Sequence, residues 1–270
     1  ACFPSHLRRY EDHFKIGGYK IFLDGSPQAR TAWMRTPYPD SDGYCGYPTI
    51  SEEDIFSALE KAWKNGMQLL AHCNGDAACA QYLSCIDAFE EKFFSFKELR
   101  PVMIHSQFLD YDQLDLVKKL SVIPSFFAAH VYHWGDTHIQ NFGFSRASRI
   151  SPAASSLKKE ILFTFHQDAP VIEPDMIETV WCAANRKTKD GILLGAQEQL
   201  PVLEALKAVT THAAYQYFEE EQKGSIAPGK FADFVILSDN PLEIEKENLR
   251  SIKVCHTIKQ DRIIYSSSEN

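Results

Sequence analysis

Residues 67–73 read MQLLAHC, a short apolar run that ends in a histidine and a cysteine. Four further segments are nearly continuous in apolar residues and rich in Ile, Val and Phe: residues 16–24 (IGGYKIFLD), 101–107 (PVMIHSQ), 121–128 (SVIPSFFA) and 161–168 (ILFTFHQD). Strands that are buried on both faces of a parallel sheet have this composition. We therefore predict five parallel strands.

Helical patterns separate these runs. Residues 51–66 begin with Ser51, a favoured N-cap residue, continue with an acidic first turn and end at Asn65-Gly66. We expect further helices over residues 76–91, 110–119, 174–185 and 200–218. Strands alternating with helices predict βαβ units and an α/β fold. Residues 231–237 and 254–265 instead resemble strands without a long helix between them, which predicts a small β appendage.

Composition narrows the classes of protein. The 270 residues are 44% apolar and 24% charged, with a net charge of −8 and no basic stripe, so a globular protein that does not bind nucleic acid is expected. The seven cysteines form no CxxC pair, which favours reduced thiols in a cytoplasmic protein. No apolar run reaches the roughly 18 residues of a membrane span, and no signal-peptide core follows the first residues.

A polar residue that can bind a metal follows three of the apolar runs: His72, His105 and Asp168. In an α/β barrel, the carboxyl ends of the strands form the active-site face. A single histidine after an apolar run is more often structural, and Asp168 could instead cap a helix before Pro170. Their shared position in three separate units nevertheless favours a metal site with imidazole and carboxylate ligands.

Lys20 lies within an apolar run. Period-2 alternation places it on one face with Phe22 and Asp24, and we expect it to be buried. Burial of an unpaired ammonium is costly. Reaction with carbon dioxide would neutralise Lys20 as a carbamate that could bridge two metal ions. The alternatives are an amine that reaches solvent or one that pairs with Asp24.

Two kinds of residue could assist catalysis. The Asp168 carboxylate could take a proton from a metal-activated water and pass it to a leaving group. His130 and His133 begin the long connection of residues 129–160, and long connections are usually functional. Either histidine could contact substrate or polarise its carbonyl, and the sequence does not rank them.

Several motifs together resemble the amidohydrolase superfamily, in particular the branch that contains N-substituted formamide deformylases. They are KIFLDGS (20–26), AHCNGDAA (71–78), IHSQ (104–107), HQDAPV (166–171) and residues 204–237, which end in the specific segment GSIAPGKFADFVIL. The resemblance implies that Lys20 is the often carboxylated lysine of barrel strand four. It also implies that His72, His105 and Asp168 are metal ligands on strands five, six and eight.

The resemblance further implies an α/β fold with a partial (β/α)8 TIM-type barrel, strands four to eight, over residues 1–225. Residues 226–270 would form the C-terminal part of a β-sandwich. The family's first-strand His-x-His pair is absent, and strands one to three have no counterpart. We therefore expect the chain to be a fragment of a longer polypeptide, which could complete its sheet by pairing or swapping with a second copy.

These observations predict a zinc-dependent hydrolase of small-molecule amides, acting on non-peptide carbon–nitrogen bonds such as those of N-formyl amines. One or two divalent metal ions would be expected in the intact enzyme. Two alternatives stay open. The chain could be a catalytically silent fragment or binding module, or a related barrel hydrolase that acts on esters or phosphoesters.

Overall fold

The computed structural model describes residues 4–11 and 13–267. The chain divides into two compact units. The first comprises residues 1–126 and 137–162, and the second comprises residues 127–136 and 163–270. The boundary at residue 225 that the sequence suggested stays a prediction, and residues on both sides of it belong to the second unit.

A parallel sheet forms the centre of the first unit. Its strands lie in chain order: β1 (Gly18–Phe22), β2 (Gln68–Cys73), β3 (Val102–His105) and β4 (Ile123–Phe126). Phe22 pairs with His72, and Cys73 pairs with His105. The strands therefore end at one common edge of the sheet, as the sequence predicted. These four strands form an open sheet within the unit, not a closed barrel.

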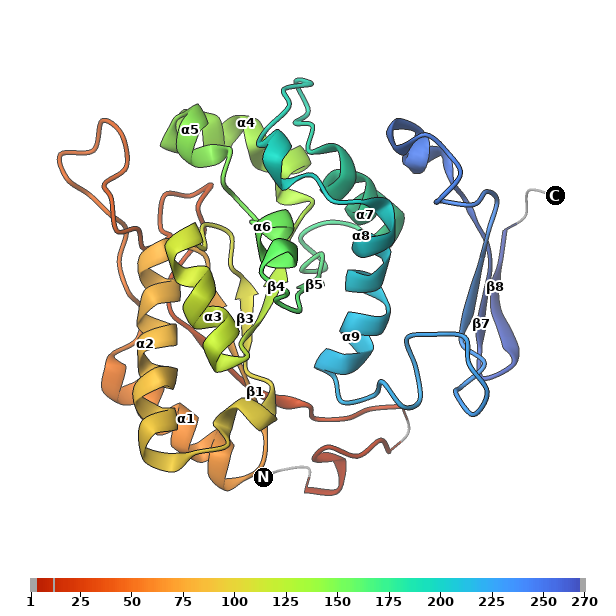
Figure 1. Ribbon diagram of the computed structural model, residues 1–270, viewed down its shortest axis with the longest axis horizontal. Helices are drawn as coiled ribbons and strands as arrows, with labels where there is room; N and C mark the ends of the chain where they lie inside the picture. Colours follow the sequence, from red (N-terminus) through yellow and green to blue (C-terminus); the bar gives the residue numbers. More distant parts are fainter. Residues whose placement is uncertain (1–3, 12, 268–270) are drawn as a thin grey trace. The chain divides into compact units, whose positions relative to one another are not determined.

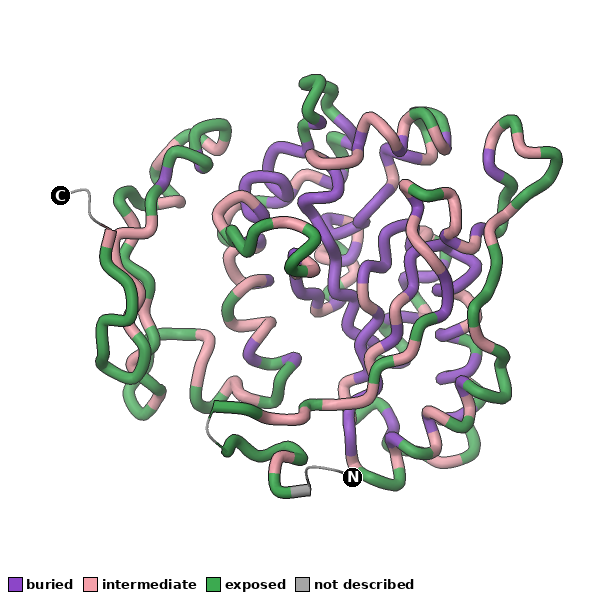
Figure 2. The backbone as a smooth tube through the Cα atoms, turned by 180° about the vertical axis from the view of Figure 1, so that it is seen from behind, coloured by how far each residue is buried: buried purple, intermediate pink, exposed green. Residues whose placement is uncertain are grey.

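Three helices lie side by side along this sheet: α1 (Glu52–Lys64), α2 (Asp76–Phe93) and α3 (Leu114–Leu120) (Figure 1). The Ser51 side chain caps α1 by accepting a hydrogen bond from the Asp54 N–H, as predicted. The 3-10 turns η1 (Pro4–His6), η2 (Phe96–Leu99) and η3 (Tyr111–Gln113) complete this part of the chain. Buried residues concentrate in the strands of the sheet and along parts of the neighbouring helices (Figure 2). Leu59, Leu69 and Met103 are fully buried.

Residues 129–160 contain helices that the sequence did not predict: α4 (His130–Phe142), α5 (Phe144–Ala147) and α6 (Ala153–Lys158). The first is rich in aromatic and histidine residues, whose helix propensity is low, so tertiary packing decides its conformation. Gly143 separates α4 from α5 at a φ of 74°, a conformation that glycine adopts without strain. The boundary between the two units falls inside α4.

The second unit contains β5 (Thr164–Phe165), α7 (Met176–Asn185), η4 (Ala196–Glu198), α8 (Val202–Val209) and α9 (Thr211–Gln216). The single helix predicted over residues 200–218 is wrong. It is broken at Thr210, whose φ of −127° and ψ of −89° are not helical. Short α8 and α9 therefore replace one long helix.

An antiparallel sheet ends the second unit: β6 (Phe234–Leu237), β7 (Val254–Lys259) and β8 (Arg262–Ser266), with η5 (Lys246–Ser251) before β7. The prediction of a single strand over 254–265 is wrong, because the chain reverses at Gln260 and Asp261. Both residues have positive φ, 49° and 64°, as a two-residue hairpin turn requires. Much of this sheet is exposed (Figure 2).

The structure thus confirms an α/β fold with a parallel sheet and a C-terminal β portion. Each cysteine of the described residues is a free thiol, as expected. None of the helices found in that part of the chain combines the length and the apolar character that crossing a membrane demands.

Candidate metal centre

Two predicted ligands, His72 and His105, meet at the carboxyl edge of the sheet. The Nδ1 of His72 lies 3.1 Å from the Nε2 of His105, and the ring centroids are 4.5 Å apart. Zinc–nitrogen bonds of 2.0–2.1 Å in a tetrahedral site place two ligand nitrogens roughly 3.3 Å apart. The two rings therefore present their nitrogens at a spacing that fits two ligands of one divalent ion.

Backbone geometry sets the direction of the His105 ring. His105 and Ser106 both have positive φ, 71° and 47°, directly at the end of β3. Such conformations are strained for residues other than glycine and cluster at functional sites. His105 is also buried. A buried histidine on strained backbone is more consistent with a functional position than with a tolerant surface position.

The other nitrogen of His72 faces polar groups from two segments. Its Nε2 lies 3.2 Å from the Gly25 carbonyl oxygen and 3.7 Å from Asp24 Oδ1. It also lies 2.9 Å from the Asn74 side-chain nitrogen. Metal-binding histidines commonly direct their second nitrogen at a carbonyl or carboxylate, which orients the ring. The Gly25 carbonyl and the Asp24 carboxylate match that arrangement, whereas the Asn74 nitrogen, a hydrogen-bond donor, does not.

Asp24 organises the backbone around His72. Its carboxylate accepts hydrogen bonds from the N–H groups of Trp33 (3.0 Å), Asn74 (2.9 Å) and Gly75 (2.7 Å). Burial raises the pKa of Asp24 to about 7, although the three N–H donors act in the opposite direction. The sequence suggests Asp24 only as a partner of Lys20. Its real partners are backbone groups, which no side-chain motif reveals.

Lys20 lies on the face predicted for it, but the prediction that it is buried is wrong. Its side chain is exposed, and its Nζ lies 4.9 Å from the centre of the Phe22 ring. The Phe22 ring in turn contacts the His72 ring, with centroids 5.4 Å apart. Lys20 therefore lies on the same side of the sheet as His72, while the burial argument for a carbamate is lost. Its role as a metal ligand stays a prediction.

An ion-pair network stabilises the loop between β1 and α1. Arg35 donates to Asp76 (3.2 Å), Asp110 (3.0 Å) and Asp112 (2.8 Å). Asp76 is the first residue of α2 and also accepts from the Arg35 backbone N–H at 2.8 Å. These contacts join the loop to the start of α2 and to the segment that follows β3.

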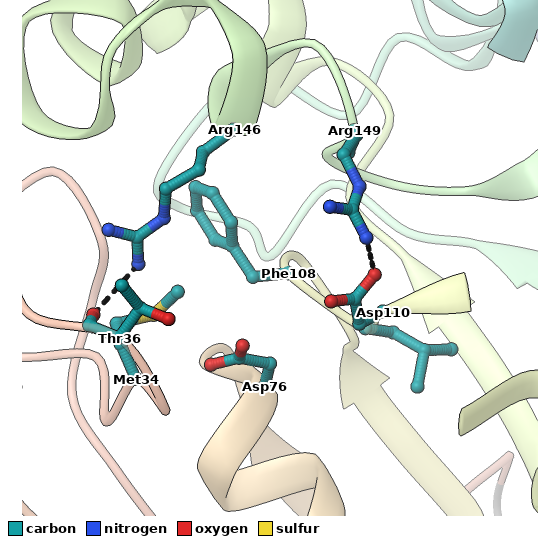
Figure 3. Close-up of a pocket in the computed structure, with 8 residues that line it drawn as sticks. Met34, Thr36, Asp76, Phe108, Asp110, Arg146 and Arg149 are labelled. Carbon is teal, nitrogen blue, oxygen red and sulfur yellow. Dashed lines mark hydrogen bonds and ion pairs between the residues drawn. The ribbon is translucent and has the colours of Figure 1, made fainter. Parts of the chain in front are cut away.

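A cavity of about 100 Å³ lies beside this network (Figure 3). Arg146 extends into it and donates to the carbonyl oxygens of Thr36 and Pro37, and Arg149 pairs with Asp110. Phe108 and Met34 supply apolar walls. Because the arginines are engaged by the loop and by Asp110, we regard the cavity as part of the structural scaffold.

The remaining predicted residues lie in the second unit. His130 is buried at the start of α4. Its ring centroid lies 4.7 Å from that of Phe127 and 4.5 Å from that of Trp134. His133 lies 3.3 Å from Glu178, the carboxylate that also pairs with Arg250. Asp168 is partly exposed and has a positive φ of 54°. The catalytic roles of His130 and Asp168 and the ligand role of Asp168 stay predictions.

Comparison with known proteins identifies the family. The model of the amidohydrolase family matches residues 4–265 of this chain. The chain belongs to the amidohydrolase family. YtcJ of Bacillus subtilis, named as an amidohydrolase, is 28% identical over 262 residues, which cover 95% of this chain and 48% of that protein. The N-substituted formamide deformylase of Arthrobacter pascens is 24% identical, covering 89% of this chain and 44% of that protein.

Solved structures agree with this assignment. The chain is similar to an uncharacterised metal-dependent hydrolase from Pyrococcus horikoshii, with a TM-score of 0.77 and 26% identity. The match covers 88% of this chain and 48% of that one. The chain thus spans about half the length of these relatives.

Proposed function

We propose that this chain carries part of the active site of a metal-dependent hydrolase that cleaves carbon–nitrogen bonds of the amide or N-formyl type. The observation that carries the proposal is the pairing of His72 Nδ1 with His105 Nε2 at 3.1 Å on neighbouring strand ends. Membership of the amidohydrolase family and the similarity to a formamide deformylase support it. The substrate class rests on that similarity alone.

His72 and His105 would hold the metal, with zinc as the expected ion and Lys20 and Asp168 as further ligands. Imidazole nitrogens and a carboxylate suit zinc. A divalent ion at this site would supply Lewis-acid activation of water and of the substrate carbonyl. The chain's own contribution is the fixed orientation of the two rings, through the backbone at His105 and the polar groups around His72 Nε2.

Asp168 would move the proton. As a water molecule adds to the carbonyl carbon, the Asp168 carboxylate takes a proton from that water. It then gives the proton to the amine nitrogen as the carbon–nitrogen bond breaks. His130 would contact the substrate. Its ring packs against Phe127 and Trp134, which limits its rotation and suits it to act as a fixed hydrogen-bond donor.

Hydrolysis of an N-formyl amine by the zinc-loaded protein tests this function. The Asp168→Asn variant should keep its fold and lose activity by roughly 10²- to 10⁴-fold. Asp239→Asn, which changes an exposed aspartate of the second unit, is the matched control and should retain activity.

Three outcomes would contradict the account in different ways. Full activity of Asp168→Asn would exclude its proton-transfer role. Cleavage of an aryl ester or phosphoester but of no amide would favour the related barrel hydrolases. Neither activity nor zinc binding would favour a binding module.

A further inference from the structure

Some groups around His72 Nε2 favour a proton on this nitrogen, and another group favours its absence. The Gly25 carbonyl oxygen at 3.2 Å and Asp24 Oδ1 at 3.7 Å are acceptors, so both favour a proton on Nε2. The Asn74 side-chain nitrogen at 2.9 Å is a donor, so it favours an Nε2 without a proton. The neighbours of His72 Nε2 thus include groups that favour each of the two neutral tautomers of the ring.

The Gly25 carbonyl also fixes the orientation of the Asn74 amide. The Asn74 Nδ2 donates to this oxygen at 2.8 Å. If the amide were reversed, its oxygen would face the carbonyl oxygen at the same short distance, with no hydrogen between them. Asn74 is buried, so no exposed rotamer relieves that contact. The amide therefore presents its N–H groups to both Gly25 and His72.

The tautomer decides whether the facing nitrogens can hold a metal. When Asn74 donates to Nε2, the ring proton of neutral His72 sits on Nδ1 and points at His105 Nε2, 3.1 Å away. The two histidines then form a closed hydrogen-bonded pair. Binding of a metal by Nδ1 requires the proton on Nε2, where Gly25 accepts it.

We propose that Asn74 is a positioning residue that stabilises the closed, metal-free tautomer of His72 and thereby weakens metal binding. This inference rests on the proposed function only for the identity of the ligands. Metal entry is coupled to a tautomer change, in which Nδ1 loses a proton and Nε2 gains one. The net charge of the ring does not change.

The tautomer of His72 in the metal-free protein tests the proposal without any assay of activity. Long-range ¹⁵N–¹H correlation NMR distinguishes Nδ1–H from Nε2–H, and the spectrum of His72→Gln assigns the signals. The wild type should show Nδ1–H, whereas Asn74→Leu, which fills the site without a donor, should show Nε2–H. A wild type with Nε2–H would overturn the proposal even if the variant does not fold.

Zinc affinity gives the second readout, measured by competition with a chelating dye. Asn74→Leu should bind zinc about 10-fold more tightly than the wild type, because the donor that opposes the metal-binding tautomer is removed; the size is that of a typical outer-shell effect on metal affinity. Asn141→Ala is the matched control, since Asn141 donates at 3.1 Å to Pro27 and Gln28 in the same loop as Gly25. It should change neither the tautomer nor the affinity.

The two proposals fail in distinguishable ways. Equal or weaker zinc binding by a folded Asn74→Leu would overturn the role of Asn74 and leave the proposed function intact. Absence of zinc binding from wild type and variant alike would contradict the proposed function, while the NMR result would still decide which tautomer Asn74 stabilises.

Discussion

The Nδ1 of His72 and the Nε2 of His105 face each other at 3.1 Å across two adjacent parallel strands. In the register of the sheet His105 pairs with Cys73, so regular alternation would turn its side chain to the face opposite His72. The positive φ of His105, 71°, departs from regular strand geometry at the end of β3 and turns the ring toward His72. Both side chains thus leave the sheet at its carboxyl edge. Two residues that are 33 positions apart in sequence form one potential binding site through strand pairing together with the left-handed backbone at His105.

Arg35 should stabilise the loop between β1 and α1. This loop carries Gly25 and also Trp33, whose backbone N–H donates to Asp24. Arg35→Gln removes the partner of the largely buried Asp76 and of Asp112, so the free energy of unfolding should fall by about 1–3 kcal/mol. Urea denaturation measures this. Lys64→Gln, which removes an exposed pair with Glu60, should change it by less than about 0.5 kcal/mol. Equal effects would contradict a special role for Arg35.

His138 should make the protein sensitive to acid. Burial lowers the pKa of this histidine from 6.5 to about 3, so the folded state binds its proton less readily than the unfolded state. The stabilisation is present above about pH 6.5. It decreases by up to about 1.4 kcal/mol per pH unit as the pH falls toward 3.

His138→Phe should therefore flatten the decline of unfolding free energy between pH 6 and pH 4. Phe was chosen because the His138 ring contacts the rings of Phe108 and Phe142, and another aromatic ring preserves the apolar packing there. Urea denaturation at each pH checks the slope, and His256→Gln in β7 should keep the wild-type slope. An identical decline in wild type and His138→Phe would exclude a buried neutral histidine.

Arg250 should resist replacement by lysine. Its guanidinium carbon lies 4.1 Å from the ring centre of Tyr132 and 4.4 Å from that of Trp181, while it also pairs with Glu178. A planar guanidinium stacks on two rings in a way that an ammonium does not. Arg250→Lys should lower the free energy of unfolding by about 1–2 kcal/mol. The melting temperature should fall accordingly. Arg262→Lys on exposed β8 should not, and equal melting temperatures for both variants would contradict the stacking role.

The strands of the parallel sheet were predictable because their residues are apolar on both faces, and the histidines at their ends followed from that prediction. The first helix was predictable because Ser51 and the acidic turn after it are local signals. Local chemistry of this kind needs no knowledge of distant residues.

The rest depends on contacts that the sequence does not display. Asp24 binds backbone N–H groups 9, 50 and 51 residues away, and backbone groups carry no residue code. The hairpin at Gln260 and Asp261 lacks the Asn-Gly pair that is the usual sequence signal of such turns. The exposure of Lys20 depends on what covers its face of the sheet, which an apolar neighbourhood in sequence does not fix.

Zinc content after equilibrium dialysis measures directly whether His72 and His105 together bind a divalent metal ion. The wild-type chain should hold about one tightly bound zinc. Both His72→Ala and His105→Ala should lose that zinc, and His256→Ala should keep it. Unchanged zinc content in a folded His72→Ala or His105→Ala protein would show that the two histidines do not hold the metal together.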